Sequence, residues 1–167
     1  MIYSRPEATD AVDQADLIDL VPLLEVHEFH TDDPSNPVVG CTLSRVLVLT
    51  QTCDLAQRKA NRVTVARVLD ANDLVAQGFA KATDVRGPIR SARVWGLYFL
   101  PAWKELGLSE MIVDLRQVHC VPLIVLETLC RTGHRRARLQ PLYREHLAKH
   151  FADTYSRIGL PMSYETE

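Results

Sequence analysis

Short apolar runs alternate with polar segments along the first half of the chain. Arg45–Thr50 (RVLVLT) is an apolar run with β-branched residues, which is typical of a buried strand. Arg62–Val68 (RVTVARV) alternates apolar and polar positions and predicts a half-buried strand. The polar segment 51–61 between them predicts a loop. Asp16–Val26 is mostly apolar but contains Pro22, which cannot donate to a central ladder. It therefore predicts an edge strand, a bent strand or two short strands.

Helical spacing and further strands follow in the second half of the chain. Asp70–Ala82 predicts a helix capped by Asp70 or Asn72, although Gly78 is a poor helix former. A shorter helix is predicted over residues 125–130. Strands are predicted over residues 93–100, 111–115, 118–123 and 136–139, and residues 31–37 (TDDPSNP) predict a loop rich in turn residues.

The final helix has the clearest start and end. Pro141 stands where a first helical residue often does, because its missing N–H costs nothing there. Gly159 and Pro161 form a usual stop signal. Between these points, one apolar side recurs every three to four residues: Leu142 or Tyr143, Leu147, Phe151, Tyr155 and Ile158. The pattern predicts a long C-terminal helix that packs through this side.

The order of elements is mostly β with three helices, which predicts an α+β fold. We expect a small, strongly bent sheet or barrel with helices packed on it. A length of 167 residues is typical of one domain. Residues 1–15 are expected to form a loose acidic lead-in, residues 16–160 a single domain, and residues 161–167 a tail.

The composition is that of an ordinary globular protein. The chain is 47% hydrophobic and 24% charged, which argues against disorder and a collagen-like structure. The longest apolar runs, such as Val121–Leu126, are too short to span a membrane, and residues 1–16 show no secretory signal. The four cysteines form no CxxC pair, so we expect free thiols in a cytoplasmic protein with no membrane partner.

Charge is segregated along the chain, although the formal net charge is only −2. Residues 1–36 hold nine acids and one base, whereas residues 45–93 hold nine bases and four acids. Residues 131–158 hold seven bases and two acids. A basic surface attracts phosphate groups, and an acidic lead segment can also lie across such a surface in the same molecule. The third interpretation is solvated charge that keeps the protein soluble.

The most unusual string is Thr50–Leu55 (TQTCDL), which places polar groups directly after a buried strand. Cys53 is a candidate reactive thiol. A cysteine nucleophile needs a lowered thiol pKa, usually from a histidine such as His119 or from a helix N-terminus. The carboxylate of Asp54 disfavours the thiolate. In the alternative interpretation, Cys53 is a small packed residue, while Thr52 and Asp54 organise the turn.

No metal or cofactor site is indicated. His146 and His150 share a helix face, but the closely spaced ligand pairs of a structural zinc site and the HExxH motif are absent. A glycine-rich phosphate loop is absent as well. We therefore expect no metal and no cofactor. A basic and aromatic segment, which suits base stacking or a core strand with one solvated end, is formed by Arg93, Trp95, Tyr98 and Phe99.

Arg45–Leu69 (RVLVLTQTCDLAQRKANRVTVARVL) resembles the PemK/MazF-like toxins. Asp16–Val21 is similar to the first strand of that family, with Ala15 in place of its glycine. The resemblance implies an SH3-like barrel, often dimeric, that cuts RNA within a toxin–antitoxin pair. The TQTCDL string is also similar to uncharacterised bacterial proteins that we associate with mobile elements and defence.

The resemblance implies roles for individual residues. The family's catalytic arginine precedes the strand, and Arg45 matches it, with Val46 in place of the family's proline. Leu69 stands where the family has a catalytic threonine or serine, and its side chain cannot transfer a proton. Cleavage would then need Arg45 to hold the scissile phosphate and Thr52 or Asp54 to handle the proton.

The first prediction for function is therefore an RNA-binding or toxin-like protein, either an active or a degenerate endoribonuclease. Its expected partners are RNA, an antitoxin or another protein, and a second copy in a homodimer. The alternative is a non-catalytic protein-interaction module or accessory subunit that uses the acidic lead segment and the final helix. An enzyme dependent on Cys53 is the third hypothesis. Phosphate contacts are expected from Arg58, Lys59, Arg62, Arg67, Arg135, Arg136 and Arg138.

Overall fold

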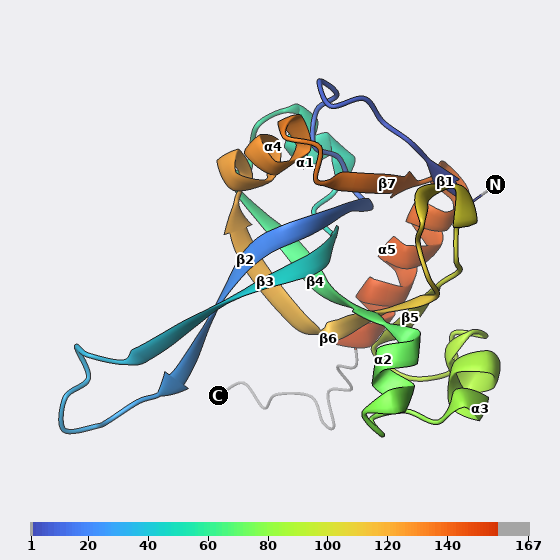
Figure 1. Cartoon of the computed structure of the whole chain (residues 1–167). Helices are drawn as coiled ribbons and strands as arrows, with labels where there is room; N and C mark the ends of the chain where they lie inside the picture. Colours follow the sequence, from blue (N-terminus) through green and yellow to red (C-terminus); the bar gives the residue numbers. More distant parts are fainter. Residues whose placement is uncertain (1, 157–167) are drawn as a thin grey trace, which may run out of the picture.

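A seven-stranded antiparallel sheet organises the computed structural model, which describes residues 2–156 (Figure 1). Its strand order is β1-β7-β2-β3-β4-β6-β5. The strands are β1 (Tyr3–Ser4), β2 (Asp16–Glu28), β3 (Val38–Val48), β4 (Arg62–Asp70), β5 (Leu97–Leu100), β6 (Met111–Pro122) and β7 (Arg135–Leu139). The α-helices are α1 (Thr52–Ala56), α2 (Ala71–Ala76), α3 (Ala82–Asp84), α4 (Leu123–Arg131) and α5 (Pro141–Tyr155). A π-helical turn, η1 (Val85–Ile89), and a 3-10 turn, η2 (Lys104–Leu106), complete the described elements. The α+β class is confirmed.

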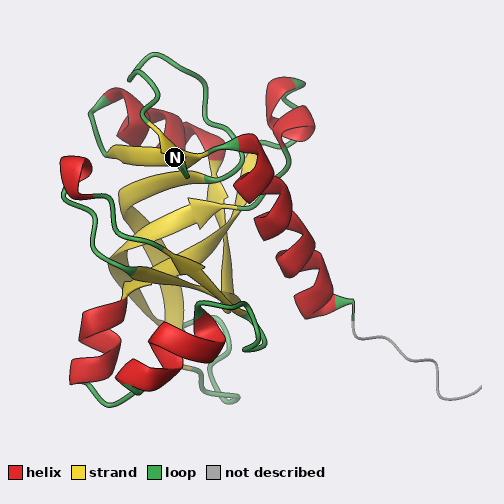
Figure 2. Ribbon diagram, turned by 90° about the vertical axis from the view of Figure 1, so that its right-hand side faces the viewer, coloured by secondary structure: helices red, strands yellow, loops and turns green. Residues whose placement is uncertain are grey.

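Register irregularities help to bend the sheet. The pairing of β2 with β3 shifts between Ile18 and Val21, where Leu20 has a φ of 60°. The pairing of β4 with β6 shifts between Ala66 and Arg67. An extra residue on one strand bends it and increases its twist. The sheet curls, but β1 and β5 lie at its two ends and do not pair. Within residues 2–156 it is therefore open and not a closed barrel (Figure 2).

Both faces of the sheet are covered because successive residues of a strand point to opposite sides. Leu47 belongs to a core that includes Leu147 of α5. Its neighbours Val46 and Val48 belong to a second core, which includes Leu126 of α4. A third, smaller cluster packs η1 and α2 against the outer strands β5 and β6. The helices thus fix the orientation of every strand that carries a predicted site residue.

Several predicted elements are confirmed, with shifted boundaries. The side chain of Asp70 accepts hydrogen bonds from the N–H groups of Asn72 and Asp73, so it is the N-cap of α2. That helix ends at Ala76, because the chain turns at Gly78, where φ is 75°. The segment 51–61 is not only loop, since it contains α1. The two predicted strands over residues 111–123 form one continuous strand, β6.

The N-terminal segment is held against the body. Tyr3 and Ser4 pair with Leu139 and Arg138 of β7, and the N–H of Ala15 donates to the carbonyl of Val48. Helix α5 begins at Pro141 as expected. Its predicted end and the tail over 161–167 lie outside the described residues. Among the described helices, none is long and apolar enough to cross a membrane.

Candidate functional site

The hairpin formed by β2 and β3 projects from the body (Figure 1). Strand β2 pairs with β7 only over residues 16–18, and β3 pairs with β4 only over residues 45–48. From residue 24 to residue 43, a segment that we call the arm, the two strands pair only with each other within the described residues 2–156. The arm therefore has two free edges, whose backbone groups are available to another strand.

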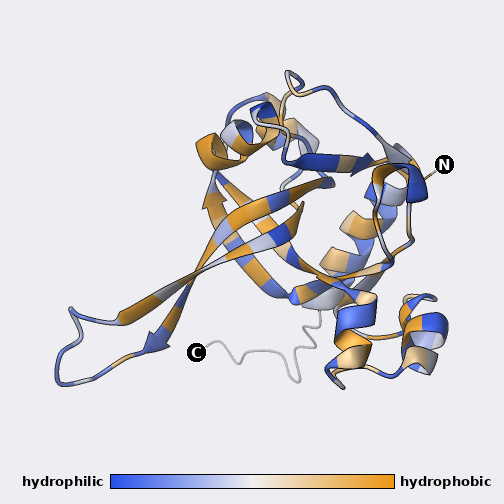
Figure 3. Cartoon of the chain, viewed as in Figure 1, coloured by the Kyte–Doolittle hydropathy of each residue, from blue (hydrophilic) through white to orange (hydrophobic). Residues whose placement is uncertain are grey.

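One face of the hairpin carries an uninterrupted row of apolar side chains. Three residue pairs lie directly opposite each other on β2 and β3, so their side chains share a face. Leu24 is 68% exposed, and Val26 and Leu43 are each 62% exposed. Figure 3 shows the apolar residues continuing from the body along both strands. We call this row the apolar stripe: Pro22 with Leu43, Leu24 with Cys41, and Val26 with Val39.

On the opposite face of the arm, the ring of His27 lies against Gly40. A side chain on Gly40 would collide with the ring of His27, so that ring occupies the space that a Cβ atom would take. The pairing of β2 with β3 shifts register between Val26 and Glu28, which leaves His27 as the extra residue of a bulge. The histidine covers the backbone on this face, whereas the apolar stripe on the other face is open to solvent.

The charges of the arm are all of one sign when its histidines are neutral. The chain has no lysine or arginine from residue 6 to residue 44. The arm carries four carboxylates: Glu25, Glu28, Asp32 and Asp33. Within the described residues, Arg67 lies 3.8 Å from Glu25 near the body, and the ring of His30 lies 3.7 Å from Glu28. No ion pair of the described residues involves Asp32 or Asp33. A surface that covers the stripe would therefore meet acidic groups around it.

A groove of about 500 Å³ lies where the arm joins the body. Two of its lining residues, Pro22 and Leu24, belong to the apolar stripe. The rest of its apolar lining comes mainly from β6 and the start of α4, with Arg62 and His119 as its basic groups. The groove and the stripe thus form one continuous apolar surface with an acidic outer part and a basic inner part.

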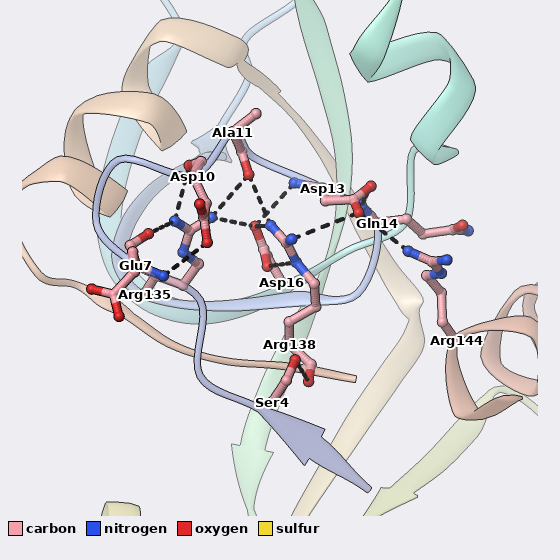
Figure 4. A network of polar contacts seen from close by, with 10 residues as sticks. All are labelled: Ser4, Glu7, Asp10, Ala11, Asp13, Gln14, Asp16, Arg135, Arg138 and Arg144. Atoms are coloured by element: carbon pink, nitrogen blue, oxygen red, sulfur yellow. Dashed lines mark hydrogen bonds and ion pairs between the residues drawn. The ribbon is translucent and has the colours of Figure 1, made fainter. Parts of the chain in front are cut away.

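The predicted phosphate contacts on β7 are occupied within the molecule (Figure 4). Arg135 and Arg138 both bind the fully buried carboxylate of Asp16, at 3.1 Å from Nη1 of Arg135 and 2.6 Å from Nε of Arg138. Both guanidinium groups also donate to the carbonyl of Ala11, at 3.0 and 2.8 Å. The basic strand and the acidic lead segment therefore neutralise each other, an arrangement that we call the β7 seam.

Asp19 binds two further predicted site residues. Its carboxylate lies 2.5 Å from Nε of Arg45 and 3.1 Å from Nη1 of Arg136. Burial would raise the pKa of Asp19, but the hydrogen bonds and charges of the two arginines outweigh burial and lower it. The guanidinium of Arg45 also lies 3.3 Å from the sulfur of Met111. Arg45 is thus an internal ion-pair partner of β2.

The structure does not bring Arg45 together with its predicted catalytic partners. Arg45 shares a face of β3 with Leu47, whereas α1 packs through Leu55 on the opposite face. Thr52 and Asp54 lie on α1. The hydroxyl of Thr52 is buried without a hydrogen-bond partner among the described residues. A phosphate group at Arg45 would therefore be separated by the sheet from both proton-transfer candidates.

Cys53 is exposed at the start of α1. Its sulfur lies 3.6 Å from the side-chain oxygen of Gln51 and 3.9 Å from the carboxylate of Asp54. Both neighbours are hydrogen-bond acceptors, and neither supplies the positive charge that stabilises a thiolate. The described contacts of Cys53 thus contain no activating base.

The remaining predicted phosphate contacts stay near the surface. Arg58 and Lys59 are exposed, and Arg62 is exposed but donates to the carbonyl of Cys120 at 2.9 Å. Arg67 is half-buried and lies 3.5 Å from the side chain of Gln117. These four residues follow α1 and lie along β4, so they form no single cluster with the arginines of β7.

Sequence reasoning identified Arg93 but missed the basic surface that this residue forms with Arg86 and Arg90 around η1. Arg86, Arg90 and Arg93 are exposed and together line a hollow of about 440 Å³. Arg90 also lies over the ring of Phe99, 5.1 Å from its centre, next to a second hollow of about 280 Å³. The recurrence of arginine at a spacing of three to four residues was the available signal. We call these three residues the η1 arginines.

The histidines of α5 take part in packing. Nδ1 of His146 lies 3.2 Å from the hydroxyl of Tyr98, and Nε2 of His150 lies 3.1 Å from the carbonyl of Leu97. In the part of the chain that the structure describes, no three His, Cys, Asp or Glu side chains are arranged to hold a metal ion.

The arm itself was only half visible in the sequence. Two apolar runs, VPLLEV and VVGCTL, flank the turn-rich segment 31–37, and that symmetry is typical of a hairpin. The second run was not predicted as a strand. A comparison with models of known protein families finds no match for this chain, and neither does a search of curated proteins.

Proposed function

We propose that this protein is a non-catalytic protein-interaction module whose binding element is the arm. The observation that carries the proposal is the apolar stripe, which stays exposed on a part of the hairpin that pairs with no other strand within residues 2–156. Exposed apolar surface of this kind is costly to keep in water and marks interaction sites. The acidic lead segment and the final helix, expected earlier as contact surfaces, are engaged by β7 and by the core.

The chemistry of the arm defines the protein partner. The partner offers an apolar surface to the stripe, and lysine or arginine side chains to the four carboxylates around it. The free backbone edges of the arm favour a partner that adds an extended segment beside β2 or β3. Apolar contacts supply most of the binding free energy, and the charges at the rim set orientation and association rate.

A photocrosslinking experiment tests this proposal. The photoreactive residue p-benzoylphenylalanine is placed at Leu43 in the apolar stripe, or at Leu142 on α5 as the matched control. Both leucines are exposed, at 62% and 77%. Each variant is irradiated in an extract of the cells that make the protein, and the adducts are identified by mass spectrometry.

We expect defined protein adducts from position 43 and none of the same identity from position 142. The adducts should persist at high salt, because apolar contacts are not screened, and should disappear when Leu24→Ser is added. Equal labelling from both positions, or no adduct from position 43, would show that the arm binds no protein and would end the proposal.

A second candidate function is favoured by the η1 arginines. The resemblance to PemK/MazF-like toxins, which have an SH3-like barrel, suggests RNA as a ligand. The surface around η1 suits single-stranded RNA, because its three arginines can contact phosphates and the nearby ring of Phe99 can stack on a base. Binding of a fluorescent single-stranded RNA is measured at 50 and 200 mM salt for wild type and for Arg86→Ala/Arg90→Ala/Arg93→Ala. The control is Lys104→Ala/Arg131→Ala/Lys149→Ala, which removes three exposed bases elsewhere on the surface. Three phosphate contacts predict about a 20-fold loss of affinity over this salt range for wild type. Equal effects of the two triple variants would remove this candidate.

A further inference from the structure

The apolar stripe and the groove at the root of the arm form one surface, and the two ends of that surface carry opposite charge. The outer end carries Glu28, Asp32 and Asp33 without any lysine or arginine nearby in the sequence. The inner end carries Arg62 and His119 at the groove. A molecule that presents the same surface in antiparallel orientation would match it in shape, and its acidic outer end would face the basic inner end.

We propose that the partner of the arm is a second copy of this chain, in a two-fold dimer with crossed arms. This assignment rests on the proposed function, because it names the protein that the arm binds. In a two-fold dimer the same patch lies on both sides of the interface, so each stripe covers the other. The acidic end of each arm then lies over the basic root of its partner.

The dimensions of the arm fit this arrangement. The free part of β2 runs from Leu24 to Glu28, and the strand rises about 3.3 Å per residue. A two-fold axis near Val26 therefore brings the segment after β2, which contains Phe29, over the groove of the other copy. Phe29 is 60% exposed in the single chain. An aromatic side chain in an apolar groove is the usual anchor of a protein interface.

Other occupants fit the surface less well. A membrane is disfavoured, because anionic lipid head groups repel an arm that has four carboxylates and no lysine or arginine. The same chain's groove cannot receive its own arm, because the arm projects away from the body at that point (Figure 1). A second copy supplies the apolar stripe, the groove and the basic rim together, and each arm is covered in the same way.

The test is the solution mass of the full chain between 5 and about 100 µM, measured by light scattering after gel filtration and by sedimentation velocity. The stripe variant Leu24→Ser/Leu43→Ser is compared with Phe79→Ser/Leu142→Ser. The control pair removes two exposed apolar side chains that lie outside the arm, each 77% exposed. Circular dichroism confirms that every variant is folded.

We expect wild type and the control pair to have twice the chain mass. The dimer dissociation constant of the stripe variant should be at least 10-fold higher than that of wild type. A charge-exchange experiment then tests the crossed arrangement. Asp32→Lys/Asp33→Lys and Arg62→Glu should each weaken the dimer when alone. An equal mixture of the two should restore it, because in the mixed dimer each arm end again meets an opposite charge.

Several results overturn the inference. A wild-type chain that stays monomeric at 100 µM excludes the second copy. If position 43 still gives specific adducts with another protein in the extract, the proposed function survives this failure. If position 43 gives no adduct, both proposals fall. If Leu24→Ser/Leu43→Ser still dimerises as wild type does, the dimer uses another surface. If the mixture of Asp32→Lys/Asp33→Lys with Arg62→Glu does not associate, the crossed arrangement is excluded.

Discussion

The β7 seam and the arm both use carboxylates from the acidic N-terminal third of the chain, but within residues 2–156 only at the seam is such a carboxylate bound by more than one arginine. At the seam, Asp16 and Asp19 are each bound by two arginines, and little charge is left for a ligand. On the arm, Asp32 and Asp33 have no basic partner within the described residues, and the apolar stripe is exposed. The difference indicates that the seam holds the fold together, whereas the arm is where the protein meets another chain.

The largest expected effect breaks the seam. In Asp16→Ala, Arg135 and Arg138 lose the buried carboxylate that they share, and only Arg138 keeps another carboxylate within 4 Å among the described residues, that of Asp13 at 3.7 Å. Removing one side of a buried ion pair costs about 3–5 kcal/mol of unfolding free energy. Urea unfolding measures this loss, with Asp32→Ala as the matched control, expected within about 0.5 kcal/mol of wild type. Equal unfolding midpoints for the two variants would show that the seam does not stabilise the fold.

The next largest effect is a difference in unfolding free energy between substitutions at two neighbouring residues of β2, one buried at the root of the arm and one in the exposed apolar stripe. Leu23 is 1% exposed and Leu24 is 68% exposed. Leu23→Ala should lower the unfolding free energy by about 2–5 kcal/mol, as cavities in cores do. Leu24→Ala should change it by less than about 0.5 kcal/mol in dilute monomeric protein, because little surface is uncovered. Thermal unfolding at low concentration distinguishes the two, and a large loss in Leu24→Ala would mean that the stripe packs within its own chain.

A smaller effect concerns the partly exposed ion pairs of Asp19. Asp19→Asn should lower the unfolding free energy by about 1–2 kcal/mol. The variant loses charged hydrogen bonds to two arginines, but solvent already screens part of this attraction in the wild type. The pKa of Asp19 is lowered below its ordinary value by Arg45 and Arg136, against the effect of burial. Its stabilisation is therefore fully present above the unfolded pKa of about 3.9 and is lost as the pH falls through the folded-state pKa. Urea unfolding measured from pH 7 to pH 2 should show that the unfolding free energy falls less steeply at acid pH in the variant than in the wild type. The same pH dependence in both proteins would contradict this role of Asp19.

The smallest expected effect is a difference in alkylation rate between the buried thiol of Cys130 and the exposed thiols, one of which, Cys41, lies on the arm. Burial raises the pKa of Cys130 to about 11, because this residue of α4 faces the second core. A raised pKa slows thiolate reactions, here roughly 100-fold at neutral pH relative to an ordinary thiol. Cys41, Cys53 and Cys120 are exposed. An alkylating reagent should therefore label three thiols in the native protein and the fourth only after denaturation. Fast native labelling of Cys130 would show that the second core opens readily.

The prediction from sequence was successful where the signal is local. Alternation and β-branching identified the buried part of β3 and residues 62–68 of β4, a capping side chain identified the start of α2, and a proline identified the start of α5. The segregation of charge also indicated that the acidic lead segment could lie on a basic surface, as it does at β7. For these strands and helix starts, residues close in sequence determine the outcome, whereas the contact of the lead segment with β7 joins residues more than 100 positions apart.

The candidate site could not be predicted in the same way. Arg135, Arg136 and Arg138 have the composition of a phosphate-binding strand, and only their position beside Asp16 and Asp19 turns them into internal partners. Likewise, VPLLEV and VVGCTL look like core strands. They become an arm because β7 and β4 pair with β2 and β3 over only a few residues.

The sequence by itself determined the local elements, the α+β class and the separation of charge, because helix caps, turn residues and apolar periodicity act over a few residues. The tertiary structure alone decided which charges are neutralised and which apolar face stays open. Alternation gives every strand two faces, but long-range strand pairing and helix packing select the face that is buried. In this chain those contacts bury Leu23 and leave Leu24 exposed, one residue further along the same strand.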